Sequence, residues 1–513
     1  MKFAKVKTAI ITGLKINIAD LEITILSGFP VFEISGISNN KGQQCFSRVR
    51  AALKNNGFQI PRGRIICHLT KEINNGDVRT IDLALALALL IADQQISNLQ
   101  NITWFIVGQL GLSGSIQKTS GIFAMSRELE LEKYYWIIPQ INQNELQNTV
   151  LERKYVAKDI SVAAEIIEGK NLSLHQPRLE KTLMPNSISE PIYEILGQPL
   201  AKRAVLIALA GWHPLLLIGS PGSGKTTIAE QTPYFMPALN EKELDEVRKI
   251  YSLNGLWNQE TNLGIIRPYK APHHTVTQMA LIGGGPNLTP GIITQAHNGI
   301  LFLDEFSEFK PQILELLKKP LSEKQINLAR KNEQQQYPAN FLLIAATNPC
   351  PCGYLFEKDS RCKCSLADIN RFKKKIQGAL LDRFQLVVMM NDLAQTELIK
   401  TAHTKVIEQT KIEKIQNQIR QAQVMQDERC ISNKISPERN ALIKVNRLAN
   451  FFQIVEQDLK SFNNLIKRNS FSPRTYLAIL RVARTIADLE ESTRVKQEHL
   501  HEALLLRQKL NLY

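Results

Sequence analysis

Residues 215–227, LLLIGSPGSGKTT, decide how the central part of this chain folds. The apolar run 215–218 is followed by eight residues that fit G-x-x-x-x-G-K-[ST], and a helix-compatible segment comes next. In this strand–loop–helix order, glycines let backbone N–H groups approach phosphate oxygens, the lysine reaches the β- and γ-phosphates, and the threonine hydroxyl ligates Mg²⁺. The predicted phosphate loop consists of Gly219, Ser220, Pro221, Gly222, Ser223, Gly224, Lys225, Thr226 and Thr227.

Three further apolar runs, at Ile300–Leu303, 341–346 and Leu386–Met390, predict buried parallel strands covered by helices, and hence an α/β fold. Asp304 and Glu305 follow the first run. A carboxylate pair there places Asp304 at the Mg²⁺ water shell and leaves Glu305 to polarise an attacking water. The second run leads through Thr347 into Asn348, at the end of a core strand where open α/β sheets bind their ligands, and Asn348 is predicted to hold that water.

Length and charge narrow the class of protein. The 513 residues allow about three domains at ~100–200 residues each. The 63 Lys and Arg outnumber the 48 Asp and Glu, giving a formal charge of +15 that is typical of proteins that meet polyanions, with a cationic enzyme as the alternative. No apolar run approaches the ~18 residues of a membrane span, so we expect no membrane partner.

The cysteines suggest a metal site. Four of the seven form the pattern Cys350-x-Cys352, nine residues, Cys362-x-Cys364. One tight cluster within an odd total favours a reducing compartment, and we expect a cytoplasmic protein. Four thiolates on a short loop suit tetrahedral Zn²⁺, although C-x-C is tighter than the usual C-x₂-C. Four reduced thiols in a loop are the alternative.

Longer stretches resemble one family. ILGQPLAKRAVLIALAGWHPLLLIGSPGSGKTT, RPYKAPHHT, GGGPNLTPGIITQAHNGILFLDEF, AATNPCPCG, GALLDRFQL and SPRTYLAILRVARTIADL are similar, in this order, to the magnesium-chelatase-like AAA+ ATPases, and in particular to the ComM/YifB group of bacterial competence-related helicases. The resemblance covers essentially the whole chain. It implies ATP and Mg²⁺ as cofactors and a hexamer of identical chains, and it assigns Asn348 to sensor 1. It also makes Arg383 an arginine finger for the neighbouring subunit, Arg474 the sensor-2 arginine, and Gln198 part of the segment that covers the adenine edge.

The resemblance also divides the chain. Residues 1–168, in which we predict a strand at 4–16, are similar to the Lon-protease-like α+β domain of the family. The segment 75–82 that matches the protease serine loop has no serine, and Phe123 stands where the protease lysine would follow. Because a Ser–Lys protease needs both groups, we expect an interaction or DNA-guiding module without proteolytic activity. A linker at 169–190, an AAA+ P-loop core at 191–392 with the cysteine-rich loop 350–364, and a C-terminal helical lid at 393–513 complete the division.

Two motifs point to contacts outside the phosphate loop. The run INLARKNEQQQYPANFLLI predicts a hairpin with Arg330 and Lys331 near its tip, where related ring ATPases touch DNA; a solvated charged hairpin is the alternative. His273 and His274 are adjacent, and on a strand they would point to opposite faces, so we expect no shared metal ion there and assign them no role.

The combined prediction is a cytoplasmic hexameric AAA+ ATPase that moves on single-stranded and branched DNA. By resemblance it drives branch migration or strand exchange in homologous recombination and natural transformation. Contacts to phosphates rather than bases suit a motor that must move along any sequence. The alternatives are an AAA+ subunit of a magnesium chelatase and an ATP-driven remodelling or inactive scaffold; stimulation of nucleotide turnover by DNA separates them.

Overall fold

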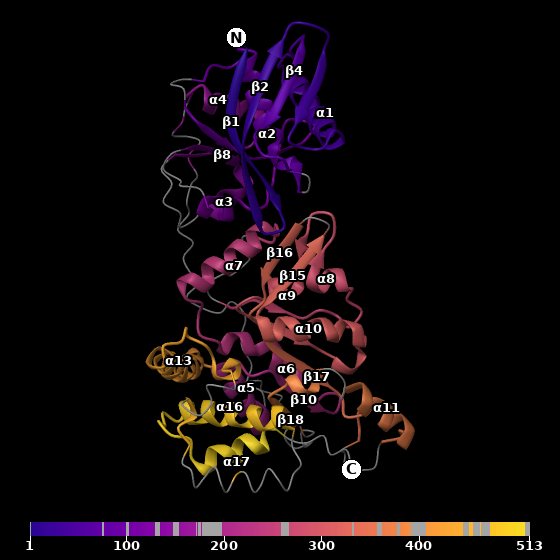
Figure 1. Cartoon of the computed structure of the whole chain (residues 1–513), viewed down its shortest axis with the longest axis vertical. Helices are drawn as coiled ribbons and strands as arrows, with labels where there is room; N and C mark the ends of the chain where they lie inside the picture. The colour runs from indigo at the N-terminus through magenta and orange to yellow at the C-terminus, as the bar shows by residue number, and fades with distance from the viewer. Residues whose placement is uncertain are drawn as a thin grey trace.

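The computed structural model describes residues 2–73, 76–98, 102–128, 134–146, 153–170, 197–257, 266–330, 333–355, 362–376, 380–390, 407–444, 451–454 and 472–507, together with 172, 176 and 462. Of the predicted linker 169–190, therefore, only residues 169, 170, 172 and 176 lie within the described part. The molecule is elongated, with the N-terminal sheet at one end and the C-terminal helices at the other (Figure 1).

The N-terminal region is a seven-stranded mixed sheet in the order β3-β4-β2-β1-β5-β8-β9. Its strands are β1 (Phe3–Thr12), β2 (Lys15–Leu26), β3 (Val31–Ser35), β4 (Arg64–Leu69), β5 (Trp104–Ile106), β8 (Tyr135–Pro139) and β9 (Lys154–Ala157). Helices α1 (Asn39–Asn55), α2 (Asp82–Ala92) and α4 (Ile160–Ile167) contribute apolar side chains to its main core. Helix α2 is apolar on nearly every face, as expected of a helix buried all round.

The prediction of one strand over 4–16 is wrong. Strands β1 and β2 form an antiparallel hairpin in which Thr12 pairs with Lys15, so the chain reverses at Gly13 and Leu14. Gly13 has φ +59, a left-handed conformation that glycine adopts without a Cβ penalty. Apolar residues on both sides of this turn hide it from a periodicity argument.

The central region holds the predicted parallel sheet, in the order β11-β14-β17-β10-β18. Strands β10 (Leu215–Gly219), β14 (Ile300–Leu303), β17 (Leu342–Thr347) and β18 (Leu386–Met390) correspond to the four predicted runs. Their side chains are almost all buried, because helices cover both faces of the sheet and leave no solvent face to alternate with. Only the edge strand β11 (Tyr269–Lys270) was not predicted; two residues are too short to show a period.

Helices of the central region and of the C-terminal region pack around this sheet. They are α5 (Pro199–Gly211), α6 (Lys225–Gln231), α7 (Glu241–Leu253), α10 (Pro311–Glu323), α13 (Gln409–Ser432), α16 (Pro473–Leu489) and α17 (Gln497–Leu505). One apolar core contains side chains of α5 and β10 together with those of α13, α16 and α17. The C-terminal helices are thus packed onto the sheet domain through a shared core.

Within the described residues, the N-terminal region contacts the central region through helix α3 and through the β1–β2 turn. Helix α3 (Ile122–Glu128) packs on α7, where Arg127 pairs with Asp245 at 3.0 Å (Figure 1). The β1–β2 turn meets the hairpin of β15 (Gln325–Arg330) and β16 (Glu333–Pro338), because Gln335 Nε2 donates to the Thr12 carbonyl at 3.0 Å. Leu14 packs against the core beneath this hairpin. The predicted hairpin therefore lies directly under the N-terminal sheet.

Candidate functional site

The phosphate loop links the carboxyl end of β10 to α6. Gly222 and Gly224 have φ +82 and +87, and a Cβ built on either would meet no protein atom within 4 Å. These glycines are therefore required by backbone conformation, and their backbone faces open space, which fits a loop that wraps a phosphate chain. The Lys225 ammonium donates to the carbonyls of Gly219 and Ser220 at 2.7 Å each, so the lysine side chain lies folded along the loop.

The Mg²⁺ ligands predicted from sequence come together in the structure. Thr226 Oγ1 donates to Asp304 Oδ2 at 2.8 Å, although the two residues are 78 positions apart. Parallel pairing of β14 with β17, and of β17 with β10, brings the ends of these strands to one edge of the sheet. A hydroxyl and a carboxylate oxygen are ligands that Mg²⁺ prefers, so this pair fits the ion that accompanies a bound nucleotide.

Glu305 lies beside the magnesium pair in a constrained conformation. Its φ of +48 is left-handed, which is uncommon for a residue with a Cβ and is typical of functional sites. Its backbone N–H donates to Asp304 Oδ1 at 2.8 Å, and its carboxylate is exposed. Glu305 Oε2 lies 3.1 Å from Nδ1 of His274.

The contact of His274 with Glu305 was missed by the sequence argument. The expectation that His273 and His274 point to opposite faces is wrong: they follow β11 in a loop and turn, and their ring centroids are 4.1 Å apart. The strand rule does not apply outside a strand. Nothing in the periodicity signals this contact, because β14 and the turn after β11 meet only in the folded sheet.

Two more predicted residues lie at the same edge. Asn348 directly follows β17, the neighbour of β10. Gln198 is the residue before α5, and its Nε2 donates to the Ser223 carbonyl of the phosphate loop at 3.3 Å.

Tyr269 on β11 is a further titratable group near this edge. Burial raises the pKa of Tyr269, and the nearby Glu230 and Asp304 carboxylates raise it further, so this hydroxyl stays protonated near the Asp304–Thr226 pair.

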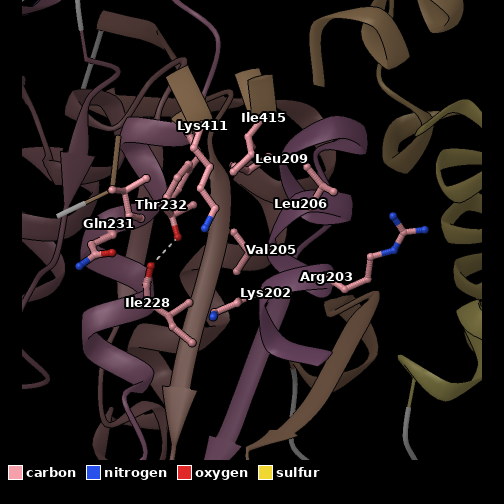
Figure 2. Close-up of a pocket in the computed structure, with 12 residues that line it drawn as sticks. Lys202, Arg203, Val205, Leu206, Leu209, Ile228, Gln231, Thr232, Lys411 and Ile415 are labelled. Carbon is pink, nitrogen blue, oxygen red and sulfur yellow. Dashed lines mark hydrogen bonds between the residues drawn. The ribbon is translucent and has the colours of Figure 1, made fainter. Parts of the chain in front are cut away.

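An apolar cavity of about 280 Å³ lies between α5, α6 and α13. Figure 2 shows that Val205, Leu206 and Leu209 form one wall, with Ile228 facing them and Ile415 at the far end. The polar residues that line the cavity are Lys202, Arg203, Gln231, Thr232 and Lys411, and the Arg203 guanidinium points away from it. The cavity adjoins the helix that begins at the phosphate loop.

Arg383 and Arg474 lie away from the phosphate loop. Arg383 ends a short 3₁₀ turn (Leu381–Arg383) before β18, and it lines a small cavity with Pro214 and Phe341, which precede β10 and β17. Since all these strands are parallel, Arg383 is at the opposite edge of the sheet, about 15 Å from the loop for a strand of this length. Arg474, at the start of α16, lies 3.9 Å from Asp382 and shares that edge.

The predicted DNA contact is described only in part. Arg330 is the last residue of β15 and pairs in the ladder with Glu333, while Lys331 lies outside the described residues.

In the N-terminal region, Lys118 donates to the carbonyls of Gly255 and Trp257 and so joins that region to the segment that follows α7. Every helix in the described part of the chain is too short or too polar to cross a membrane.

The strand order, the phosphate loop and the Asp304–Thr226 pair together define a P-loop domain of the AAA+ class. A family model described as magnesium chelatase, subunit ChlI, matches residues 192–398, and its C-terminal counterpart matches 409–507. A third model, described as subunit ChlI of Mg-chelatase, matches residues 21–142.

Curated proteins match over almost the whole length. Competence protein ComM of Haemophilus influenzae is 30% identical over 513 residues, which cover 98% of this chain and 97% of that protein. The uncharacterized protein YifB of Salmonella typhimurium is 29% identical over 517 residues, covering 99% and 97%. Lon protease 2 of Bacillus subtilis is 27% identical over 240 residues, covering 42% and 41%. The chain therefore belongs to the magnesium-chelatase-like ComM/YifB family.

Proposed function

We propose that this protein is an AAA+ ATPase that assembles into a hexameric ring and uses ATP to move on single-stranded and branched DNA in the cytoplasm. The observation that carries the proposal is the division of the catalytic groups between two edges of one sheet. Lys225, Thr226, Asp304, Glu305 and Asn348 lie at one edge, and Arg383 and Arg474 at the other. In this proposal each chain binds the phosphates at one edge of its sheet and presents arginines to the neighbouring chain from the other edge. A ring of identical subunits needs both surfaces on every chain.

Each residue has a role in this scheme. The loop N–H groups and Lys225 bind the phosphates, and Mg²⁺ held by Thr226 and Asp304 would neutralise phosphate charge. The Glu305 carboxylate accepts a proton from the attacking water, and Asn348 orients that water. The neighbour's Arg383 stabilises charge that develops on the γ-phosphoryl oxygens. Since Arg474 shares the edge of Arg383, we propose that it also reaches the neighbouring site, rather than its own.

The purine base has a place beside α5. Gln198 at the start of this helix contacts Ser223, and the apolar cavity follows along the same helix. We place the base at the end of this cavity nearest Lys202 and Ile228, where apolar walls suit an aromatic ring. The helical segment 393–513 then serves as the lid, and residues 1–168 serve as a module that guides DNA toward the β15–β16 hairpin beneath it.

ComM is named as a competence protein, and we propose a role of that kind for this chain: branch migration or strand exchange during homologous recombination and natural transformation. The alternative comes from the name of the matched family model, the ATPase subunit of a magnesium chelatase. The deciding experiment measures ATP turnover alone, with single-stranded, duplex and forked DNA, and with porphyrin plus purified partner chelatase subunits. Stimulation by forked DNA supports the motor, and stimulation only by the chelatase components overturns it.

A further inference from the structure

The thiols of Cys350, Cys352, Cys362 and Cys364 converge at one point. Their Sγ atoms are 3.3 Å apart for Cys350–Cys352, 3.8 Å for Cys350–Cys362 and 3.5 Å for Cys352–Cys362, and all four lie within 4.8 Å of one another. All four are free thiols. Within the described residues, this is the one group of three or more His, Cys, Asp or Glu side chains arranged closely enough to hold a metal ion.

These spacings fit one tetrahedral centre. A Zn–S bond of about 2.3 Å in a tetrahedron places neighbouring sulfurs about 3.8 Å apart. The three sulfur–sulfur distances among Cys350, Cys352 and Cys362, 3.3 to 3.8 Å, are at or slightly below that value. Thiolates are soft ligands that select Zn²⁺ over Mg²⁺, so this centre is chemically distinct from the Asp304–Thr226 pair.

The cysteine cluster lies against the nucleotide site. Cys350 comes two residues after Asn348, and the Gly353 N–H donates to the Cys350 carbonyl at 3.0 Å. A Cβ built on Gly353, which has φ +88, would lie 2.5 Å from Cδ of Pro221 and 3.8 Å from Cγ of Asn348. The loop that carries the first two cysteines is thus close to both the phosphate loop and Asn348, the residue that follows β17.

We propose that Cys350, Cys352, Cys362 and Cys364 bind one Zn²⁺, and that this ion fixes their loop against Pro221 and Asn348 so that the phosphate loop keeps its nucleotide-binding shape. The metal assignment stands on the sulfur geometry alone. The support of nucleotide binding rests, in addition, on the proposed ATPase function. A short loop has little core of its own, and a metal cross-link replaces that core.

The first experiment tests the metal. The full chain is purified under reducing conditions without added metal, and zinc and iron are measured by mass spectrometry. We expect about one zinc per chain in the wild type. Exchange with Co²⁺ is expected to give the visible absorption of tetrahedral cobalt bound to thiolates. Both signals are expected to be lost in Cys352→Ser with Cys364→Ser and kept in Cys67→Ala, a buried thiol of the N-terminal sheet.

Either of two results overturns the metal assignment. Wild-type protein that contains no zinc and gives no cobalt spectrum returns the cluster to four thiols, and iron in place of zinc refutes the choice of metal. Both results come from the wild type, so they hold even if the double cysteine variant fails to fold.

The second experiment tests the link to the nucleotide site. The affinity for a fluorescent ATP analogue is compared between wild type and the Cys352→Ser, Cys364→Ser variant, with circular dichroism as the check on folding. We expect binding to weaken on the order of tenfold, the scale on which outer-shell supports act. Unchanged affinity in a folded, zinc-free variant refutes the supporting role. Lys225→Ala is expected to lose nucleotide and keep zinc, so failure of the ATPase proposal is distinguished from failure of the metal site.

Discussion

Glu305 combines an unfavourable backbone conformation with an exposed carboxylate at the edge where Asp304 and Thr226 meet. A left-handed φ at a residue with a Cβ costs on the order of 1–3 kcal/mol and persists only where its surroundings enforce it. The Glu305 N–H bond to Asp304 and the contact with His274 supply that enforcement. The proposed general base is thereby oriented by the same Asp304 carboxylate that we assign to the metal.

We predict that two substitutions in this site separate ATP binding from ATP turnover. Lys225→Ala should abolish ATP binding, because the loop loses its phosphate-neutralising ammonium. Glu305→Gln should bind ATP normally but turn over roughly 10²- to 10⁴-fold more slowly, since only proton acceptance is removed. Binding of a fluorescent ATP analogue and steady-state phosphate release measure the two effects. Glu308→Gln, three residues further on, is the matched control and should turn over like wild type. Normal turnover by Glu305→Gln would refute its role.

The sequence predicted residues of the site better than it predicted their arrangement. The phosphate loop and the Asp304–Glu305 pair follow apolar runs that predict buried parallel strands, so their order along the chain already predicted that they lie at one edge of the sheet. The contact of His274 with Glu305 depends on a turn that has no periodicity. The position of Arg383 depends on strand direction, and that of Arg474 on how α16 packs against the turn before β18. The catalytic roles of all these residues remain predictions.

Elements, too, differ in how far sequence predicts them. The four central strands were predicted almost to the residue, because buried parallel strands are continuous apolar runs. The turn between β1 and β2 was predicted as part of a strand over 4–16, because Leu14 at this turn is apolar and packs against the core of the central region. The turn carries an apolar residue because Leu14 packs against another region of the molecule, and not because an apolar residue favours a turn locally.

One buried histidine joins the sheet to the lid and makes their attachment sensitive to acid. His213 Nδ1 lies 2.6 Å from Gln385 Oε1, and its Nε2 lies 2.7 Å from Thr485 Oγ1 on α16. Complete burial lowers the pKa of His213 from 6.5 to about 4. Between these values the unfolded chain binds a proton that the folded chain does not, so stability is full above pH 6.5 and falls as the pH falls toward 4.

We therefore predict a pH dependence that one substitution reduces. This histidine should account for a loss of up to about 3 kcal/mol between pH 6.5 and 4. His213→Gln removes the titrating group and should be less stable than wild type at pH 8, yet should lose less stability on acidification. Denaturant unfolding at several pH values measures both slopes. Equal slopes for the two proteins would exclude His213 as the source.

The β15–β16 hairpin is the element we expect to meet DNA. Arg330→Ala with Lys331→Ala should lower DNA affinity equally on all sequences and reduce the steepness of its salt dependence, because two fewer phosphates are neutralised. It should also uncouple ATP turnover from DNA. Lys318→Ala with Lys319→Ala removes the same charge from α10, where each lysine is within 4.0 Å of a glutamate, and should have a smaller effect. Fluorescence anisotropy at several salt concentrations gives the comparison. Normal DNA stimulation of the hairpin variant would exclude this contact.

For the whole molecule, the proposed function makes ATP hydrolysis a property of the ring, because the two groups of site residues lie at opposite edges of the central sheet. The phosphate loop and Arg383 are separated by the length of β10, so one chain cannot apply its own Arg383 to its own nucleotide. The N-terminal sheet rests on the hairpin through the Thr12–Gln335 bond, and the lid shares a core with α5. In the proposed ring, nucleotide binding at one interface would therefore act, through these packed contacts, on the lid and on the hairpin that we propose meets DNA.

This arrangement predicts complementation between two inactive variants. Arg383→Ala should bind ATP and hydrolyse little, because its own site faces a neighbour without the finger. Lys225→Ala has the finger but no working phosphate loop. In mixed rings, some interfaces place an intact Lys225 site against an intact Arg383, so ATP turnover should partly recover. Since a random mixture contains few consecutive working interfaces, branch migration on a labelled four-way junction should recover less than turnover.

The measurement needs proof that the rings are mixed, and differently tagged chains that co-purify provide it. The matched control is Arg371→Ala, an exposed arginine on α11 (Leu366–Ile376), mixed with Lys225→Ala. In this control mixture, ATP turnover should be proportional to the fraction of Arg371→Ala chains, because that variant is expected to be active by itself. If mixed rings of Arg383→Ala and Lys225→Ala hydrolyse no more ATP than either parent, Arg383 does not act across the interface. If wild-type protein hydrolyses ATP in the presence of DNA but never moves a junction, the proposal that it is a DNA motor is refuted.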